Sequence, residues 1–184
     1  IQERFGAIPA KATPRQAPER KMPTGGDLKF LNLQDKELPL TAVGVGRFVP
    51  AKPLESMEDF RREFVETLAA TLLSKRMEEA RSKGEVSFLM GGAAVAPIVR
   101  SMRIQATLAM LSPDKVVEGT RDLLTEVERA RRHGFAQSEI DRGAKQVIAA
   151  LENMTRNAIS GKESSADLVA ELTRFHLQKM AMPG

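Results

Sequence analysis

The order in which two kinds of hydrophobic spacing follow one another is the feature that most constrains this chain. Strand-like stretches, alternating or rich in β-branched and small residues, run over Leu28–Leu33, Leu38–Val49, Val86–Val99 and Ser101–Met110. From Met57 to Lys83, apolar residues instead recur every three to five positions, which is typical of a long amphipathic helix. Strands that come in pairs and helices that are largely segregated from them predict an α+β fold, with an antiparallel or mixed β-sheet layered against helices.

Capping residues suggest where the helices begin and end. Ser56 is a suitable N-cap for the long helix, and Gly84 a suitable terminator. Three more helices are predicted: the first between Ser112-Pro113 and His133-Gly134, the second from Ala136 or Ser138 to Ile159, and the third from Ser164 or Ser165.

The last predicted strand has two chemically different faces. Its even-numbered positions are apolar, and its odd-numbered positions include Arg103, Gln105 and Thr107. We therefore expect the even-numbered face to be buried and the other face to be at least partly wet. The apolar positions are Met102, Ile104, Ala106, Leu108 and Met110.

Prolines mark a boundary near the start of the chain. Pro9, Pro14, Pro18 and Pro23 punctuate a basic stretch that cannot form a helix. We interpret residues 1–26 as the end of a preceding domain and a linker, and residues 27–184 as one α+β domain. The alternative, a basic strap that touches phosphates, predicts binding to polyanions that weakens steeply with salt.

Composition excludes several kinds of site. The chain has no Cys, which removes disulfides, thiolate nucleophiles and Cys-ligated metals. Its two histidines, His133 and His176, are forty-three positions apart and lack a nearby second ligand, so we expect no zinc site in this chain. With no Trp or Tyr there are few platforms for stacking bases, and no apolar stretch is long enough to cross a bilayer, so we expect neither a nucleic-acid nor a membrane partner.

The candidate contact surface is a run of small residues in a predicted strand. Gly91, Gly92, Ala93 and Ala94 would let another backbone approach closely. They are a possible contact for a peptide or a neighbouring domain, and the alternative is a bulged or bent strand. Arginines near His133 are interleaved with acidic residues, which favours a solvated, salt-bridged face over a DNA-reading surface.

Several segments resemble the pitrilysin/insulinase family of zinc peptidases, to which the mitochondrial processing peptidases are similar. The strongest is Leu123–Arg142, in which a helix ending at His133-Gly134-Phe135 is followed by Ala136-Gln137-Ser138-Glu139-Ile140-Asp141-Arg142. Leu72–Glu79 is similar to the Arg-Leu near the end of a long helix in that family, and Phe5–Pro9 to the end of its preceding domain. Ala136 stands where the family usually has Thr, which leaves Glu139 to supply half of a capping box.

The family's His-x-x-Glu-His motif has no counterpart in this sequence. The resemblance therefore implies a non-catalytic second domain that walls a substrate chamber and helps position a peptide. Its partners would be that peptide and a catalytic domain of the same parent protein, and zinc would be held there and not in this chain. The alternative is an inactive scaffold or interaction module related to processing-peptidase core subunits.

The family pattern also implies a C-terminal truncation after Met182-Pro183-Gly184, because a further helix and strand would follow. We expect the uncovered edge to favour dimers of the fragment. The implied compartment is the bacterial periplasm or cytoplasm.

Overall fold

The computed structural model describes residues 3, 6–7, 26–37, 40–52, 54–99, 101–160 and 164–178. The strands are β1 (Thr41–Pro50), β2 (Met90–Val99) and β3 (Met102–Leu111), and the helices are α2 (Met57–Ser82), α3 (Val116–His133), α4 (Gln137–Ile159) and α5 (Ser165–Gln178). A short 3₁₀ turn, Pro113–Lys115, precedes α3. The predicted linker and the segment Met182-Pro183-Gly184 lie almost wholly outside the described residues.

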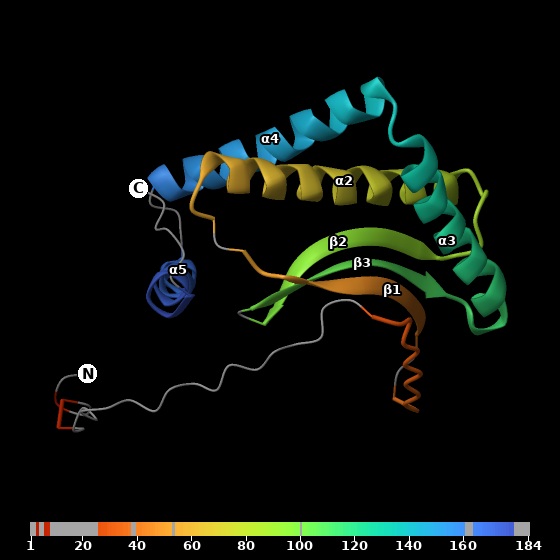
Figure 1. Cartoon of the computed structure of the whole chain (residues 1–184), viewed down its shortest axis with the longest axis horizontal. Helices are drawn as coiled ribbons and strands as arrows, with labels where there is room; N and C mark the ends of the chain where they lie inside the picture. The colour runs from red at the N-terminus through yellow and green to blue at the C-terminus, as the bar shows by residue number, and fades with distance from the viewer. Residues whose placement is uncertain are drawn as a thin grey trace.

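The sheet has three strands in the order β1-β3-β2, and β3 pairs antiparallel with both neighbours. β1 and β2 therefore run parallel to each other, so the chain must cross over between them, and α2 makes that crossover. Figure 1 shows the curved sheet below α2 and α4 lying along the other side of α2, in agreement with the contacts between these elements. The predicted α+β class, with an antiparallel sheet layered against helices, is confirmed.

The helix ends follow the predicted capping residues closely. The Ser56 hydroxyl accepts a hydrogen bond from the Asp59 backbone N–H at 3.1 Å and caps α2. Gly84 and Gly134, just beyond α2 and α3, have φ values of +72° and +65°. Only glycine adopts this left-handed region without strain, so both helices end where the sequence indicates.

The hydrophobic core lies where α2 and α3 meet the sheet. Its buried cluster is Met77, Phe88, Ala109, Leu111 and Leu123. Phe88 lies in the loop before β2, because this strand begins at Met90 and not at the predicted Val86. A Cβ on Gly91 would lie 2.8 Å from the Phe88 ring, so the glycine is what lets that ring enter the core.

The predicted strand at Leu28–Leu33 is wrong. The structure gives this segment no regular secondary structure, and Phe30 is 91% exposed. A turn follows the segment, where Asp35 accepts a hydrogen bond from the Glu37 N–H at 2.9 Å. Alternation favours an extended backbone, but a strand also needs a paired edge, and β1 pairs with β3 instead.

The predicted orientation of β3 is wrong for most of the strand, although Met102 at its start is buried as expected, at 2% exposure. The odd-numbered face packs against the helices, with Ala109 and Leu111 fully buried, whereas Leu108 on the even-numbered face is 52% exposed. The polar odd positions tolerate this because Arg103 meets Glu66 of α2 at 3.2 Å. An ion pair between the layers thus takes the place of the apolar contact that the alternation suggested.

Candidate functional site

The predicted contact residues lie on β2, at an edge of the sheet. Ser74 of α2 accepts a hydrogen bond from the Ala93 N–H at 2.9 Å and lies 3.2 Å from the Ala93 carbonyl. This strand edge is therefore occupied by the protein itself at Ala93. The pairing register puts Gly92 opposite Leu108 and Ala94 opposite Ala106, so these two positions face away from the core.

Gly92 and Ala94 belong to a sheet face that no described helix covers, which we call the open face. None of the residues on this face carries a charge. The register assigns to it Ala42, Gly44, Gly46, Phe48 and Pro50 of β1, Met90, Gly92, Ala94 and Ala96 of β2, and Ile104, Ala106, Leu108 and Met110 of β3. Met102, at the start of β3, has the same register parity but is buried. Met90, Leu108 and Phe48 are 63%, 52% and 46% exposed. Exposed apolar patches larger than a few hundred Å² are uncommon on monomeric proteins and are often functional.

Of the open face, the sequence pointed only to Gly92 and Ala94 of β2 as contact residues, and it placed the even-numbered positions of β3 in the interior. The β1 part was missed, although its signal is visible: positions 42, 44, 46, 48 and 50 are all uncharged, and Arg47 lies among the others. Gly44 and Gly46 keep this part of the face flat, because a Cβ on Gly46 would lie 2.9 Å from that of Ala106.

A clasp on the helical side joins the segments that carry the family-like residues. Arg76 of α2 donates to both carboxylate oxygens of Glu139, at 2.8 and 3.0 Å, and to the Gly134 carbonyl at 3.1 Å. Its guanidinium also lies 4.7 Å from the centre of the Phe135 ring. Glu139 in turn accepts the Ala136 N–H at 2.7 Å, which confirms the predicted half of a capping box. The motif thus fixes the turn between α3 and α4.

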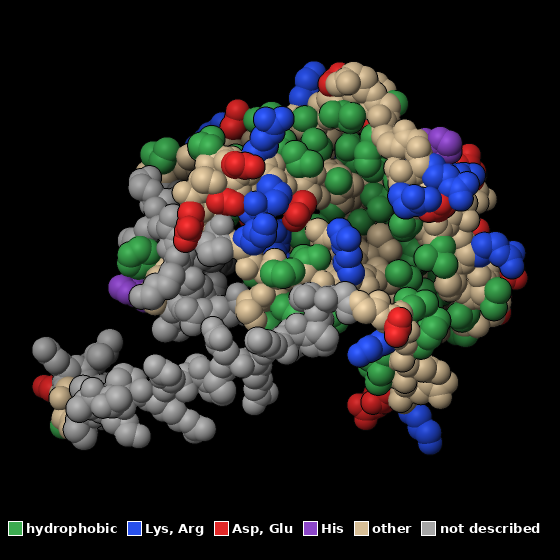
Figure 2. Space-filling model, viewed as in Figure 1, with side chains coloured by type: hydrophobic (Ala, Val, Ile, Leu, Met, Phe, Trp, Pro, Cys, Tyr) green, Lys and Arg blue, Asp and Glu red, His purple; other side chains and the backbone are tan. Residues whose placement is uncertain are grey.

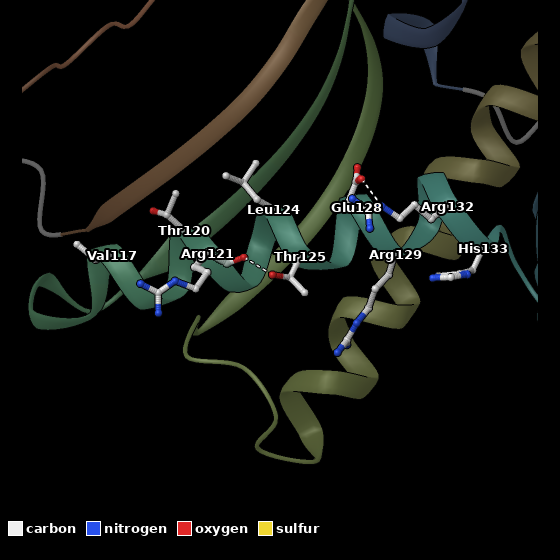
Figure 3. Close-up of a pocket in the computed structure, with 9 residues that line it drawn as sticks. All are labelled: Val117, Thr120, Arg121, Leu124, Thr125, Glu128, Arg129, Arg132 and His133. Carbon is white, nitrogen blue, oxygen red and sulfur yellow. Dashed lines mark hydrogen bonds and ion pairs between the residues drawn. The ribbon is translucent and has the colours of Figure 1, made fainter.

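The arginines around α3 are mostly paired. Glu128 accepts hydrogen bonds from Arg131 at 2.6 Å and from Arg132 at 2.5 Å, and the nearly buried Glu126 accepts one from Arg129 at 2.6 Å. Figure 3 shows Glu128, Arg129 and Arg132 of this group along α3. On the visible face of the molecule, basic and acidic side chains are interspersed over the helices (Figure 2). The surface is therefore a mixture of signs, as the sequence pattern indicated.

Among the carboxylates with a lowered pKa, Glu128 and Glu139 belong to the turn region around α3 and α4. Hydrogen bonds from Arg131 and then Arg132 lower the pKa of Glu128 to about 2. The pKa of Glu139 is also lowered, chiefly by its hydrogen bonds from Arg76. Both groups are ionised and paired at neutral pH, so they act as structural anions and are poorly suited to proton transfer.

Neither histidine lies in a cluster of potential ligands. His133 is the last residue of α3 and is exposed, and His176 is on α5 beside Phe175, with the ring centres 4.9 Å apart. Within the described residues, no three His, Asp or Glu side chains come together in a way that could hold a metal ion. In this same part of the chain, every helix is too short or too polar to cross a bilayer.

No protein-family model matches the sequence. No curated protein matches it either. Solved structures do match the fold. The periplasmic protease PqqL from Escherichia coli is similar at 17% identity and a TM-score of 0.74, over 82% of this chain and 16% of that one. The first half of PqqL, solved separately, gives a TM-score of 0.73 at 17% identity, over 82% of this chain and 32% of that one.

A third similar structure is described as a predicted insulinase family protease from Yersinia pestis. It is 15% identical, with a TM-score of 0.63, over 76% of this chain and 30% of that one. The chain therefore has the fold of a peptidase-like half-domain of insulinase-family proteases, and it spans between 16% and 32% of the length of these structures.

Proposed function

We propose that this chain is a non-catalytic domain of an insulinase-like zinc metallopeptidase, in which it walls the substrate chamber and helps position the peptide. The observation that carries the proposal is the open face, which is uncharged over three strands and uncovered by any described helix. The similarity in fold to one part of longer proteases supports it, because such a part relies on neighbouring domains to complete the site.

In this proposal the chemistry lies in a separate catalytic domain, where zinc would activate the water that attacks the peptide bond. The present chain contributes orientation and exclusion of water. A peptide lying across the open face would meet apolar side chains such as Leu108 and Met90, and Gly92 and Ala94 would let its backbone approach closely. Holding the substrate in a reactive orientation raises turnover without any contact to the metal.

Bulk on the open face tests the proposal. Gly92→Val suits the purpose, because a Cβ there would have as its nearest neighbour the Ser74 hydroxyl at 3.6 Å, an ordinary contact, and valine favours strands. In the longer protease that contains this chain, we expect Gly92→Val to lower kcat/KM for peptide hydrolysis while zinc content and melting temperature stay unchanged.

The matched control is Ala149→Val, at an exposed position of α4 far along the chain from the open face. It should leave kcat/KM unchanged. Unaltered kinetics for Gly92→Val would remove the open face from the substrate path. Absence of both zinc and turnover in the longer protein would instead identify the domain as part of a scaffold.

A further inference from the structure

A hollow of about 520 Å³ lies on the opposite side of the sheet from the open face, between the sheet, α2 and α3. We call it the inner hollow. Its walls include Val45 of β1, Leu73 of α2, Val127 of α3 and Phe135. Small residues such as Ala70 leave the space between these walls unfilled. Both its size and its largely apolar lining are typical of binding sites for small ligands.

One part of the lining is polar. Arg47 of β1 reaches it, and its Nε donates to the Gln105 side chain at 2.7 Å. Within the described residues Arg47 forms no ion pair, so its charge is matched only by a neutral amide. Glu66 of α2 lines the same hollow. Its Oε2 is buried and accepts no hydrogen bond, although the Arg103 guanidinium lies 3.2 Å away.

These polar groups specify what a ligand must carry. Arg103 is shared between two carboxylates, Glu66 and Glu63, so this cluster has one more negative charge than positive. A buried carboxylate oxygen without a donor is costly, and a ligand N–H would satisfy it. The guanidinium of Arg47 suits a carboxylate, to which it can donate more than one hydrogen bond. The charges thus complement a ligand with one cationic and one anionic end.

We propose that the inner hollow binds a short apolar peptide with free termini. Its ammonium group donates to Glu66, its carboxylate accepts from Arg47, and its apolar side chains occupy the space between Leu73, Val45 and Val127. A fatty carboxylate would pair with Arg47 but leave the Glu66 oxygen without a donor. This site is on the helical side of the sheet, so it does not depend on the role proposed for the open face.

The test is calorimetric titration of the whole 184-residue chain with leucyl-leucine at neutral pH. We expect saturable binding of one dipeptide per chain. Acetylation of its amino group or amidation of its carboxylate should each weaken binding by about tenfold or more, the effect of one lost charge-assisted hydrogen bond. Octanoate that binds as tightly as the dipeptide would overturn the proposal, and so would the absence of saturable binding at millimolar dipeptide.

Two variants locate the site. Arg47→Gln should weaken the dipeptide by about tenfold and leave the far-ultraviolet circular dichroism spectrum unchanged, because Arg47 is exposed. Ala70→Phe should abolish binding by filling the hollow. The control, Arg121→Gln on the outer side of α3, should bind like the unmodified chain. If Arg47→Gln binds the dipeptide equally well, the assignment is wrong, whatever becomes of open-face variants in the longer protease.

Discussion

Arg76 is the side chain whose removal should best reveal how the helices are held together. It joins α2 to the turn between α3 and α4 through Glu139, the Gly134 carbonyl and the Phe135 ring. The ion pair is about three-quarters buried, with side-chain exposures of 22% and 23%. Its charged hydrogen bonds contribute about 1–1.5 kcal/mol at this exposure, and the cation–π contact about 0.5–1 kcal/mol. Arg76→Ala should therefore lower the free energy of unfolding by about 2 kcal/mol.

Far-ultraviolet circular dichroism in urea is the suitable assay, because the chain has no Trp or Tyr to report by fluorescence. The melting temperature should fall by about 4–8 °C. Arg76→Lys should lose about 1 kcal/mol, since a lysine keeps the charge but not the planar fork. Lys75→Ala, at an exposed neighbour, should change stability by less than about 0.5 kcal/mol. Equal losses for Arg76→Ala and Lys75→Ala would refute the clasp.

Three further predictions concern stability. Ala136→Thr should stabilise the chain by about 1 kcal/mol, because a hydroxyl there can accept the Glu139 N–H, and Ala136→Val, which lacks the hydroxyl, should give no such gain in the urea midpoint. Gly119→Val should destabilise by about 1–3 kcal/mol, because even a Cβ at this position would overlap Leu111, whereas Ala149→Val should cost well under 1 kcal/mol. Below its ordinary pKa of 4.5, Glu128 should lose stabilising contacts as pH falls toward about 2, so Glu128→Gln should flatten the dependence of the urea midpoint on pH in that window, and an unchanged slope would contradict this.

Local chemistry explains why the helices could be predicted well from the sequence. Ser56, Gly84 and Gly134 act through their own backbone conformation or through bonds within one turn, so no distant residue is needed to recognise them. The reciprocal bond between Ala136 and Glu139 is of the same kind, because both partners lie within four positions. These caps and turns form as the sequence predicts because no contact with a distant part of the chain competes with them.

The pairing and facing of strands could not be predicted in this way. Leu28–Leu33 alternates as a strand does, but whether it pairs depends on an edge elsewhere in the chain. The face of β3 was misjudged because Arg103 has partners on α2, about forty residues earlier, and sequence spacing does not reveal them. The inner hollow was missed for the same reason, since β1, α2 and α3 approach one another only in the fold.

The residues that made the family resemblance specific serve the architecture. Arg76, Gly134, Phe135 and Glu139 meet in one clasp, which holds the turn between α3 and α4 whether this chain serves a protease or a scaffold protein. Substituting Arg76 should therefore lower stability in either kind of protein. Gly92→Val should lower turnover only where a peptide crosses the open face on its way to a metal. Comparing the two variants in one protein therefore separates residues that stabilise the fold from residues that position the substrate. Sequence resemblance alone does not distinguish these two roles.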